Sequence, residues 1–270
     1  MRSEEKEIGR VGLGTAPLAF SDRSVADGVD VTLAALESGV RLIDTALAYT
    51  RPGIESFAEA VVARALRQWR GEQPVVATKG GHWRDGDDFP VDGRPSTLRR
   101  HCETSMRTLG VERIDLYQLH HVDPDVPLPE SVAALAGLRD EGKVAAIGLS
   151  NVTIAQLQEA RTVASIASVQ NQLSFAVRDD LPMVGYCTRE GIGYLAYMPL
   201  GGPGAIAGPA FAPLRSLAAR TGTSAHRLAV AWVLAQSDAV VALVGATRPA
   251  SIRDSAHAAP LLPELLAELG

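Results

Sequence analysis

Four polar side chains stand at or just after the ends of predicted strands, where their types could support acid–base chemistry. Asp44 ends the second short apolar run, Lys79 the third and His120 the fourth, while Tyr49 follows Asp44 by five residues. Charged groups at successive ends of parallel strands converge on one small volume. An ammonium beside a phenol favours phenolate, so we expect Lys79 to lower the pKa of Tyr49 toward the working pH.

This set of residues suits the reduction of a carbonyl group, provided that another group supplies a hydride. Tyr49 would protonate the developing alkoxide, Asp44 would hold the Lys79 charge in place, and His120 would donate a hydrogen bond to the same oxygen. An alternative is a Schiff-base aldolase that uses Lys79 as its nucleophile. The Asp44 partner argues against that chemistry, because an ion pair does not help an amine that must be neutral.

The elements that would position these residues alternate between short apolar runs and helix-length segments. Ser24, Ser96 and Thr153 stand where helix N-caps are expected. Eight runs read as buried strands: Val11–Gly14, Arg41–Asp44, Pro74–Lys79, Ile114–His120, Val144–Leu149, Ala167–Gln170, Gly193–Tyr197 and Val240–Val244. Eight strand–helix units in this length predict an α/β fold, a (β/α)8 TIM barrel, as a single domain over residues 1–270.

Composition narrows the class of protein. The chain has 270 residues, is 46% hydrophobic and carries a formal charge of −5, which disfavours a broad nucleic-acid surface. No apolar run is long enough to cross a membrane and no secretory signal is readable, so we expect a soluble, cytoplasmic enzyme. Cys102 and Cys187 do not form a disulfide framework. Because neighbouring residues on a strand point to opposite faces, His120 and His121 are not expected to share a metal ion.

Seven segments resemble, in order, the motifs of the aldo-keto reductases. They run in sequence from about Ile8 to Ala259, nearly the whole chain. The segments are Leu42-Ile-Asp44-Thr-Ala46-x-x-Tyr49, Ala77-Thr-Lys79-Gly80, Ile114-Asp-Leu-Tyr117-Gln-Leu-His120, Ile147-Gly-Leu-Ser150-Asn151, Val169-Gln170-Asn-Gln-Leu-Ser174, Tyr197-Met-Pro-Leu200-Gly201 and Val244-Gly-Ala-Thr-Arg248-Pro.

The resemblance implies a barrel that binds NADP(H) and reduces aldehydes or ketones. The family's catalytic tetrad falls on Asp44, Tyr49, Lys79 and His120. On the cofactor side, the resemblance implies a nicotinamide site and an arginine for the 2′-phosphate at Arg248 or Arg253. The implied nicotinamide-site residues are Ser150, Asn151 and Gln170 for the carboxamide, Tyr197 for stacking on the ring, and Leu200 and Gly201 beside them. An alternative for Asn151 is a helix N-cap.

The substrate and the partners are less defined by the sequence. Trp83, Phe89 and His121, with Phe20 and His82, are expected to line the mouth of the barrel, although Trp83 and Phe89 could instead pin their loop to it. We expect a small-molecule carbonyl substrate, no nucleic-acid or membrane partner, and a monomer. Some relatives of this fold bind the nucleotide and act as non-catalytic regulatory subunits, which is a second alternative for this chain.

Overall fold

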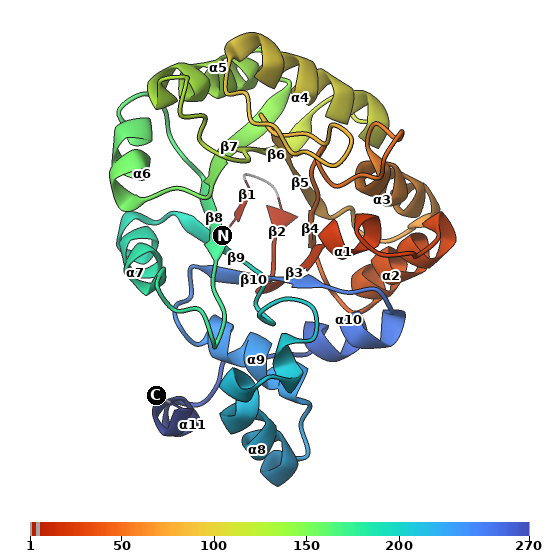
Figure 1. Cartoon of the computed structure of the whole chain (residues 1–270), viewed down its shortest axis with the longest axis vertical. Coiled ribbons are helices and arrows are strands. Elements are labelled where there is room, and N and C mark those ends of the chain that lie inside the picture. The colour runs from red at the N-terminus through yellow and green to blue at the C-terminus, as the bar shows by residue number, and fades with distance from the viewer. Residues whose placement is uncertain (1, 4–5, 270) are drawn as a thin grey trace.

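Eight parallel strands form a closed barrel in the computed structural model, which describes residues 2–3 and 6–269 (Figure 1). Around the barrel the order is β10-β3-β4-β5-β6-β7-β8-β9, with every neighbouring pair parallel. The predicted (β/α)8 barrel is therefore confirmed. The strands are β3 (Val11–Gly14), β4 (Leu42–Asp44), β5 (Val75–Gly80), β6 (Ile114–Leu119), β7 (Val144–Ser150), β8 (Ser168–Gln172), β9 (Gly193–Tyr197) and β10 (Val240–Gly245), and a two-stranded antiparallel pair precedes them, β1 (Arg2–Ser3) with β2 (Lys6–Glu7).

Helices surround the barrel as an outer ring (Figure 1). Within the described residues, no helix is both long and apolar enough to cross a membrane. The helices are α1 (Ala16–Ala19), α2 (Val25–Glu37), α3 (Phe57–Gln68), α4 (Pro95–Leu109), α5 (Leu128–Asp140), α6 (Ile154–Arg161), α7 (Leu181–Glu190), α8 (Ala212–Thr221), α9 (Ala225–Leu234), α10 (Pro249–Ala256) and α11 (Pro263–Leu269), with short 3-10 turns η1 (Ala205–Ala207) and η2 (Pro209–Phe211) between β9 and α8.

Two of the three predicted helix N-caps are confirmed. The side chains of Ser24 and Thr153 accept hydrogen bonds from backbone N–H groups in the first turns of α2 and α6, and both sites are complete capping boxes. The prediction for Ser96 was wrong, because α4 begins earlier, at Pro95, with Arg94 as its N-cap residue. Proline suits that first turn because its missing N–H would have no helical partner there.

Alternation along the strands divides the core into two layers. Residues that face the inside of the barrel form one apolar cluster, and the next residues along the same strands pack outward against the helices in a larger one. The inner cluster consists of Ile8, Leu42, Val75, Ala77, Leu116, Leu195, Val241 and Leu243. Two residues beyond Leu42, Ala77 and Leu116, toward the strands' carboxyl ends, the same inward face carries Asp44, Lys79 and Gln118, so apolar packing supports a polar layer above it.

The end of β5 illustrates this division. Lys79 faces inward and is fully buried, whereas the preceding Thr78 faces helix α3 and donates from Oγ1 to Glu59 Oε1 at 2.5 Å. Ser56 Oγ also donates to the Glu59 carboxyl, at 2.7 Å, and burial raises the pKa of Glu59. This buried carboxyl therefore fixes the outer face of the strand whose inner face carries Lys79.

Gly80 is required by the close approach of Tyr117. A methyl group on Gly80 would lie 1.8 Å from Tyr117 Oη, and the Tyr117 hydroxyl donates to the carbonyl of Leu98 at 3.1 Å.

We predict that Gly80→Ala lowers the free energy of unfolding by about 1–3 kcal/mol, the usual range for overpacking. In urea unfolding, the double variant Gly80→Ala with Tyr117→Phe should lose less stability than the sum of the two single losses, because Phe removes the clashing oxygen. Simple additivity of the two losses would contradict this explanation.

Candidate active site

The four predicted catalytic residues meet at the carboxyl ends of β4, β5 and β6. Lys79 Nζ lies 2.7 Å from Asp44 Oδ2 and 3.2 Å from Tyr49 Oη. The ring of His120 meets the ring of Tyr49 edge to face, with centroids 5.6 Å apart. The phenol oxygen accepts from the ammonium, so its own proton is available for a substrate oxygen. The geometry fits the acid–base chemistry expected of this set.

Lys79 is held as a cation. Its three ammonium hydrogens have three acceptors, namely Asp44 Oδ2, the Thr45 carbonyl at 3.0 Å and Tyr49 Oη. Burial by itself would lower the pKa of Lys79, but the nearby Asp44 carboxylate and the Tyr49 oxygen outweigh burial, so the pKa is raised. The amine therefore stays protonated at neutral pH.

The expected lowering of the Tyr49 pKa was wrong in sign. Burial of the phenol raises its pKa, and the Asp44 carboxylate adds to that effect. The Lys79 ammonium lowers the pKa of Tyr49, but by less than burial raises it. The phenol is thus fully protonated at neutral pH, which suits a group that must donate a proton.

Three imidazoles gather beside the phenol. The rings of His120 and His121 are stacked with centroids 5.0 Å apart, and His82 lies 4.9 and 4.8 Å from them. The expectation that His120 and His121 point to opposite faces was wrong, because β6 ends at Leu119 and strand alternation no longer applies. Burial lowers the pKa of each ring, and the Lys79 ammonium lowers the pKa values of His120 and His121 further, so all three are neutral at pH 7.

Tyr49 belongs to a closed circle of aromatic side chains in which each ring contacts the next. Phe20 contacts both Tyr49 and Phe89, with centroids 6.1 and 6.0 Å apart; Phe89 stacks on His82 at 5.6 Å; and His82 and Tyr49 both meet His120. Phe20 and Phe89 are 51% and 39% exposed, so part of each ring is open to solvent. The structure thus places Phe89 within this circle and His121 against two of its members, His82 and His120, while their contact with substrate stays a prediction.

Trp83 lies apart from this circle. Its ring meets His101 of α4 edge to face, with centroids 5.5 Å apart, and both residues line a cavity of about 200 Å³. Leu47, Ile54 and Arg100 are among the other residues around that cavity. The structure therefore agrees with the alternative in which Trp83 pins its loop to the barrel, rather than with a position at the mouth.

The residues implied for the nicotinamide form a second cluster. Tyr197 Oη donates to Asn151 Oδ1 at 2.8 Å, and Asn151 Nδ2 donates to Ser150 Oγ and to the His120 carbonyl. Ser150 Oγ donates in turn to the Gln170 carbonyl at 2.9 Å. Asn151 has φ of 58°, an uncommon conformation that clusters at functional sites. The N-cap alternative for Asn151 is excluded, because Thr153 caps α6.

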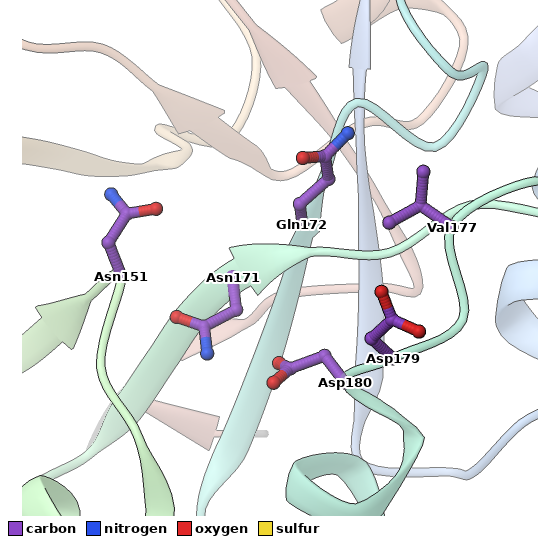
Figure 2. A pocket seen from close by; sticks show the side chains of 6 residues that line it. All are labelled: Asn151, Asn171, Gln172, Val177, Asp179 and Asp180. Carbon is purple, nitrogen blue, oxygen red and sulfur yellow. The ribbon is translucent and has the colours of Figure 1, made fainter.

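Asn151 also borders a polar cavity of about 270 Å³ at the ends of β7 and β8 (Figure 2). Asn171 and Gln172 point in opposite directions in this view (Figure 2), and the Asn171 amide exchanges two hydrogen bonds with the backbone of Val152, before α6. Asp180 accepts from the Tyr194 hydroxyl at 2.6 Å and serves as the residue before α7 without capping it through its side chain. The cavity opens beside the predicted nicotinamide residues.

Leu200 and Gly201 lie in the tight turn that follows β9. Gly201 has φ of 79° and its N–H donates to the Met198 carbonyl at 2.8 Å. A side chain at Gly201 would meet the Phe211 ring at 2.8 Å, so this turn requires glycine. Leu200 and Gly201 are thus three and four residues after Tyr197, which ends β9, and their contact with a cofactor stays a prediction.

The two candidate phosphate-binding arginines occupy different surroundings. Arg248 is exposed and is the N-cap residue of α10, where backbone N–H groups and the helix dipole favour an anion. Arg253 lies in the last turn of that helix and pairs with Glu37 of α2 at 2.9 Å. The structure therefore favours Arg248 over Arg253.

Gln118 is a member of the site that the sequence analysis did not identify. It is fully buried, pairs in register with Lys79, and points its amide toward Asp44 at 3.4 Å. A signal was available, because Gln118 stands two residues after the apolar Leu116 on the same strand and so shares its inward face. A polar residue at that position of an apolar strand calls for a partner.

With the fold and site in view, comparisons with known proteins define the class. Residues 8–269 match the sequence model of the Aldo/keto reductase family. The chain therefore belongs to the aldo-keto reductases.

Particular relatives are similar over most of the chain. An uncharacterized oxidoreductase of Schizosaccharomyces pombe is 33% identical over 86% of this chain and 74% of its own length. Pyridoxine 4-dehydrogenase of Escherichia coli is 30% identical over 95% of this chain and 91% of its own. Among solved structures, glycerol dehydrogenase from Gluconobacter oxydans has a TM-score of 0.85 at 28% identity, and an aldo/keto reductase from Klebsiella pneumoniae in complex with NADP and acetate has a TM-score of 0.81 at 27% identity; each alignment covers 99% of this chain and 92% of the other.

The buried histidines predict an acid-sensitive fold. The pKa values of His82 and His101 are lowered to about 4, mainly by burial. Their unfolded pKa is about 6.5, so the unfolded chain binds more protons between these two values and stability must fall as pH decreases through that window. We predict a falling melting temperature from pH 6.5 to 4.

The matched variant is His101→Asn, which offers an acceptor near the position of Nδ1, the atom that receives the Gly81 N–H at 3.2 Å. This variant should be less stable at pH 7 because it leaves a small void, but its stability should depend less steeply on pH. An unchanged slope would exclude His101 as a source of the acid sensitivity.

Proposed function

We propose that this protein is an NADP(H)-dependent oxidoreductase that reduces an aldehyde or a ketone to an alcohol, with Tyr49 as the general acid. The observation that carries the proposal is the hydrogen bond in which Tyr49 Oη accepts from Lys79 Nζ at 3.2 Å, inside a buried Lys79–Asp44 pair. This contact leaves the phenolic proton for the substrate oxygen and puts a fixed cation behind the charge that develops on the phenol. When bound, the nicotinamide supplies the hydride.

The roles of the protein's own groups follow from their contacts. Tyr49 transfers its proton to the carbonyl oxygen during reduction and takes it back during alcohol oxidation. Lys79 stabilises the phenolate that this transfer leaves, and Asp44 keeps the ammonium charged and in place. His120 is a neutral imidazole with one N–H, which is suited to orienting the same oxygen.

The cofactor residues of the chain fit a dinucleotide. Tyr197 offers a half-buried ring fixed by its bond to Asn151, a flat surface suited to a nicotinamide. Asn151 and Ser150 offer amide and hydroxyl groups at the edge of that ring, and Arg248 offers a guanidinium at a helix N-terminus for a phosphate. The Klebsiella pneumoniae relative was solved in complex with NADP, which supports the same cofactor here.

The two alternatives are less well supported. A Schiff-base aldolase needs a neutral amine, whereas the pKa of Lys79 is raised by Asp44 despite the burial that opposes it. A non-catalytic regulatory subunit has no need of the Lys79–Tyr49 hydrogen bond or of the neutral His120 beside it. Both remain distinguishable by experiment, through borohydride trapping on Lys79 and through turnover.

The circle of rings around Tyr49 favours a carbonyl carried on a flat, largely apolar group. Phe20 lies beside Tyr49 and Phe89, both phenylalanines are exposed, and His82 stacks on Phe89. The neutral histidines add no positive charge of their own that would attract an anion. The name of one relative, pyridoxine 4-dehydrogenase, agrees with a substrate that has a planar ring. Aromatic aldehydes are therefore the first substrates to assay.

Tyr49→Phe tests the proposed chemistry. The phenyl ring keeps the contacts with Phe20 and His120 but has no proton to give, so we predict a loss of kcat of about 10²–10⁴-fold, the usual contribution of general acid–base catalysis. The control is NADPH binding, measured by quenching of tryptophan fluorescence, which should be within threefold of wild type, roughly 0.6 kcal/mol. Near-normal kcat would refute the assignment of Tyr49 as the acid.

Arg248→Ala tests the cofactor phosphate site. Because a guanidinium pairs strongly with phosphate, its removal should raise the Kd for NADPH by about tenfold or more and leave the Kd for NADH nearly unchanged. Arg253→Ala is the matched control, and both affinities should survive because Arg253 pairs with Glu37 instead. If only Arg253→Ala lost NADPH affinity, the phosphate would bind near the last turn of α10, and its assignment to Arg248 would be wrong.

A further inference from the structure

The Asp44 carboxylate is bound on both of its oxygens, and only one of them faces Lys79. Oδ2 accepts from Lys79 Nζ at 2.7 Å, whereas Oδ1 accepts from Gln170 Nε2 at 2.8 Å and lies 3.4 Å from Gln118 Nε2. All four residues are at most 2% exposed. A carboxylate can only accept, so both amides must turn their nitrogen toward it.

The bond between Gln170 and Asp44 crosses the barrel. In the closed order of strands, β8 lies four strands from β4 in either direction, so the two side chains reach each other from opposite walls. Glutamine is the longer of the two neutral amide side chains, and its length is what this span uses. Gln118 reaches the same oxygen from β6, two strands away from β4.

Gln118 and Gln170 both serve this site as hydrogen-bond donors, through their Nε2 atoms. Gln118 Oε1 is buried and has no hydrogen-bond partner within residues 2–3 and 6–269, which is a costly arrangement unless the other end of the amide has a use. The use that the structure offers is Asp44 Oδ1. Neutral donors stabilise the carboxylate without adding charge, so the Lys79–Asp44 pair stays the only opposite-charge contact at this point.

We propose that Gln118 and Gln170 are positioning residues that orient the Asp44 carboxylate, and through it Lys79, for proton transfer at Tyr49. Fixing Oδ1 fixes the rotation of the carboxylate, which aims Oδ2 at the ammonium. The ammonium then keeps its remaining hydrogens on the Thr45 carbonyl and on Tyr49 Oη. This inference rests on the proposed function, and it gives Gln170 a role toward Asp44 beyond the implied contact with the carboxamide.

The decisive variants are Gln170→Met and Gln118→Met, which keep side-chain length and volume but remove the donor. For Gln170→Met we expect kcat to fall by about tenfold or more, the scale of one hydrogen bond to a charged group. The pKa in the pH profile of alcohol oxidation, which we assign to Tyr49, should move upward. Without the Gln170 donor, the negative charge of Asp44 is less neutralised and opposes formation of the Tyr49 phenolate more strongly. Gln118→Met should shift both quantities in the same direction by less, since its contact is longer.

A double-mutant cycle separates this role from cofactor binding. In an Asp44→Asn background, adding Gln170→Met should cost no further kcat and leave the pH profile where Asp44→Asn puts it. The Kd for NADPH, from tryptophan quenching of the same proteins, reports any loss of the implied carboxamide contact, which by itself would not move the pH profile. Thermal unfolding at pH 7 establishes whether each variant is folded. If Gln170→Met does not fold, Gln118→Met tests the same inference independently.

Contrary outcomes are distinct. If Gln170→Met weakens NADPH binding by more than tenfold while the pH profile stays unchanged, Gln170 serves the cofactor alone and the inference is wrong. Equal losses of kcat in the wild-type and Asp44→Asn backgrounds would also overturn it. Neither result touches the proposed function, which fails only if Tyr49→Phe retains its turnover.

Discussion

A fully buried ion pair between Lys79 and Asp44 sets the terms for the rest of the site. Removing two charges from water is costly unless each finds complete hydrogen bonding, so the structure surrounds both with partners. The ammonium has three acceptors and the carboxylate receives amide donors in addition to the lysine. The imidazoles beside them carry lowered pKa values, so these rings are neutral and add no uncompensated cation to the pair. The phenol of Tyr49 is placed where the pair can act on it.

The barrel can accommodate this pair because its strands separate packing from chemistry. Inward positions near the start of the strands pack against one another, and inward positions near their carboxyl ends carry polar groups. Outward positions pack against helices, and there Thr78 and Glu59 anchor the strand that bears Lys79. The close contact between Gly80 and Tyr117 belongs to the same strand end. The polar residues at the strand ends are thus supported by the inner apolar cluster and by the contacts of β5 with the surrounding helices.

Much of this arrangement could be predicted from the order of residues, and the failures have physical causes. Strand ends and the meeting of Asp44, Tyr49, Lys79 and His120 follow from alternation and topology, which local sequence encodes well. The sign of the Tyr49 pKa shift could not be predicted, because it depends on how deeply the ring is buried. Gln118 was overlooked because its partner is distant in sequence, and the stacking of His120 on His121 depends on where β6 stops. Trp83 faces away because its loop folds back onto α4.

The bond from Gln170 to Asp44 ties two opposite walls of the barrel together at the level of the chemistry. A cross-section that departs from a circle changes the distance between those walls, and this bond spans that distance. Heat, hydrostatic pressure or a bulky substitution in the outer helical layer would then reach the carboxylate without touching the mouth. The roundness of the barrel becomes a mechanical property on which the acidity of a single phenol depends.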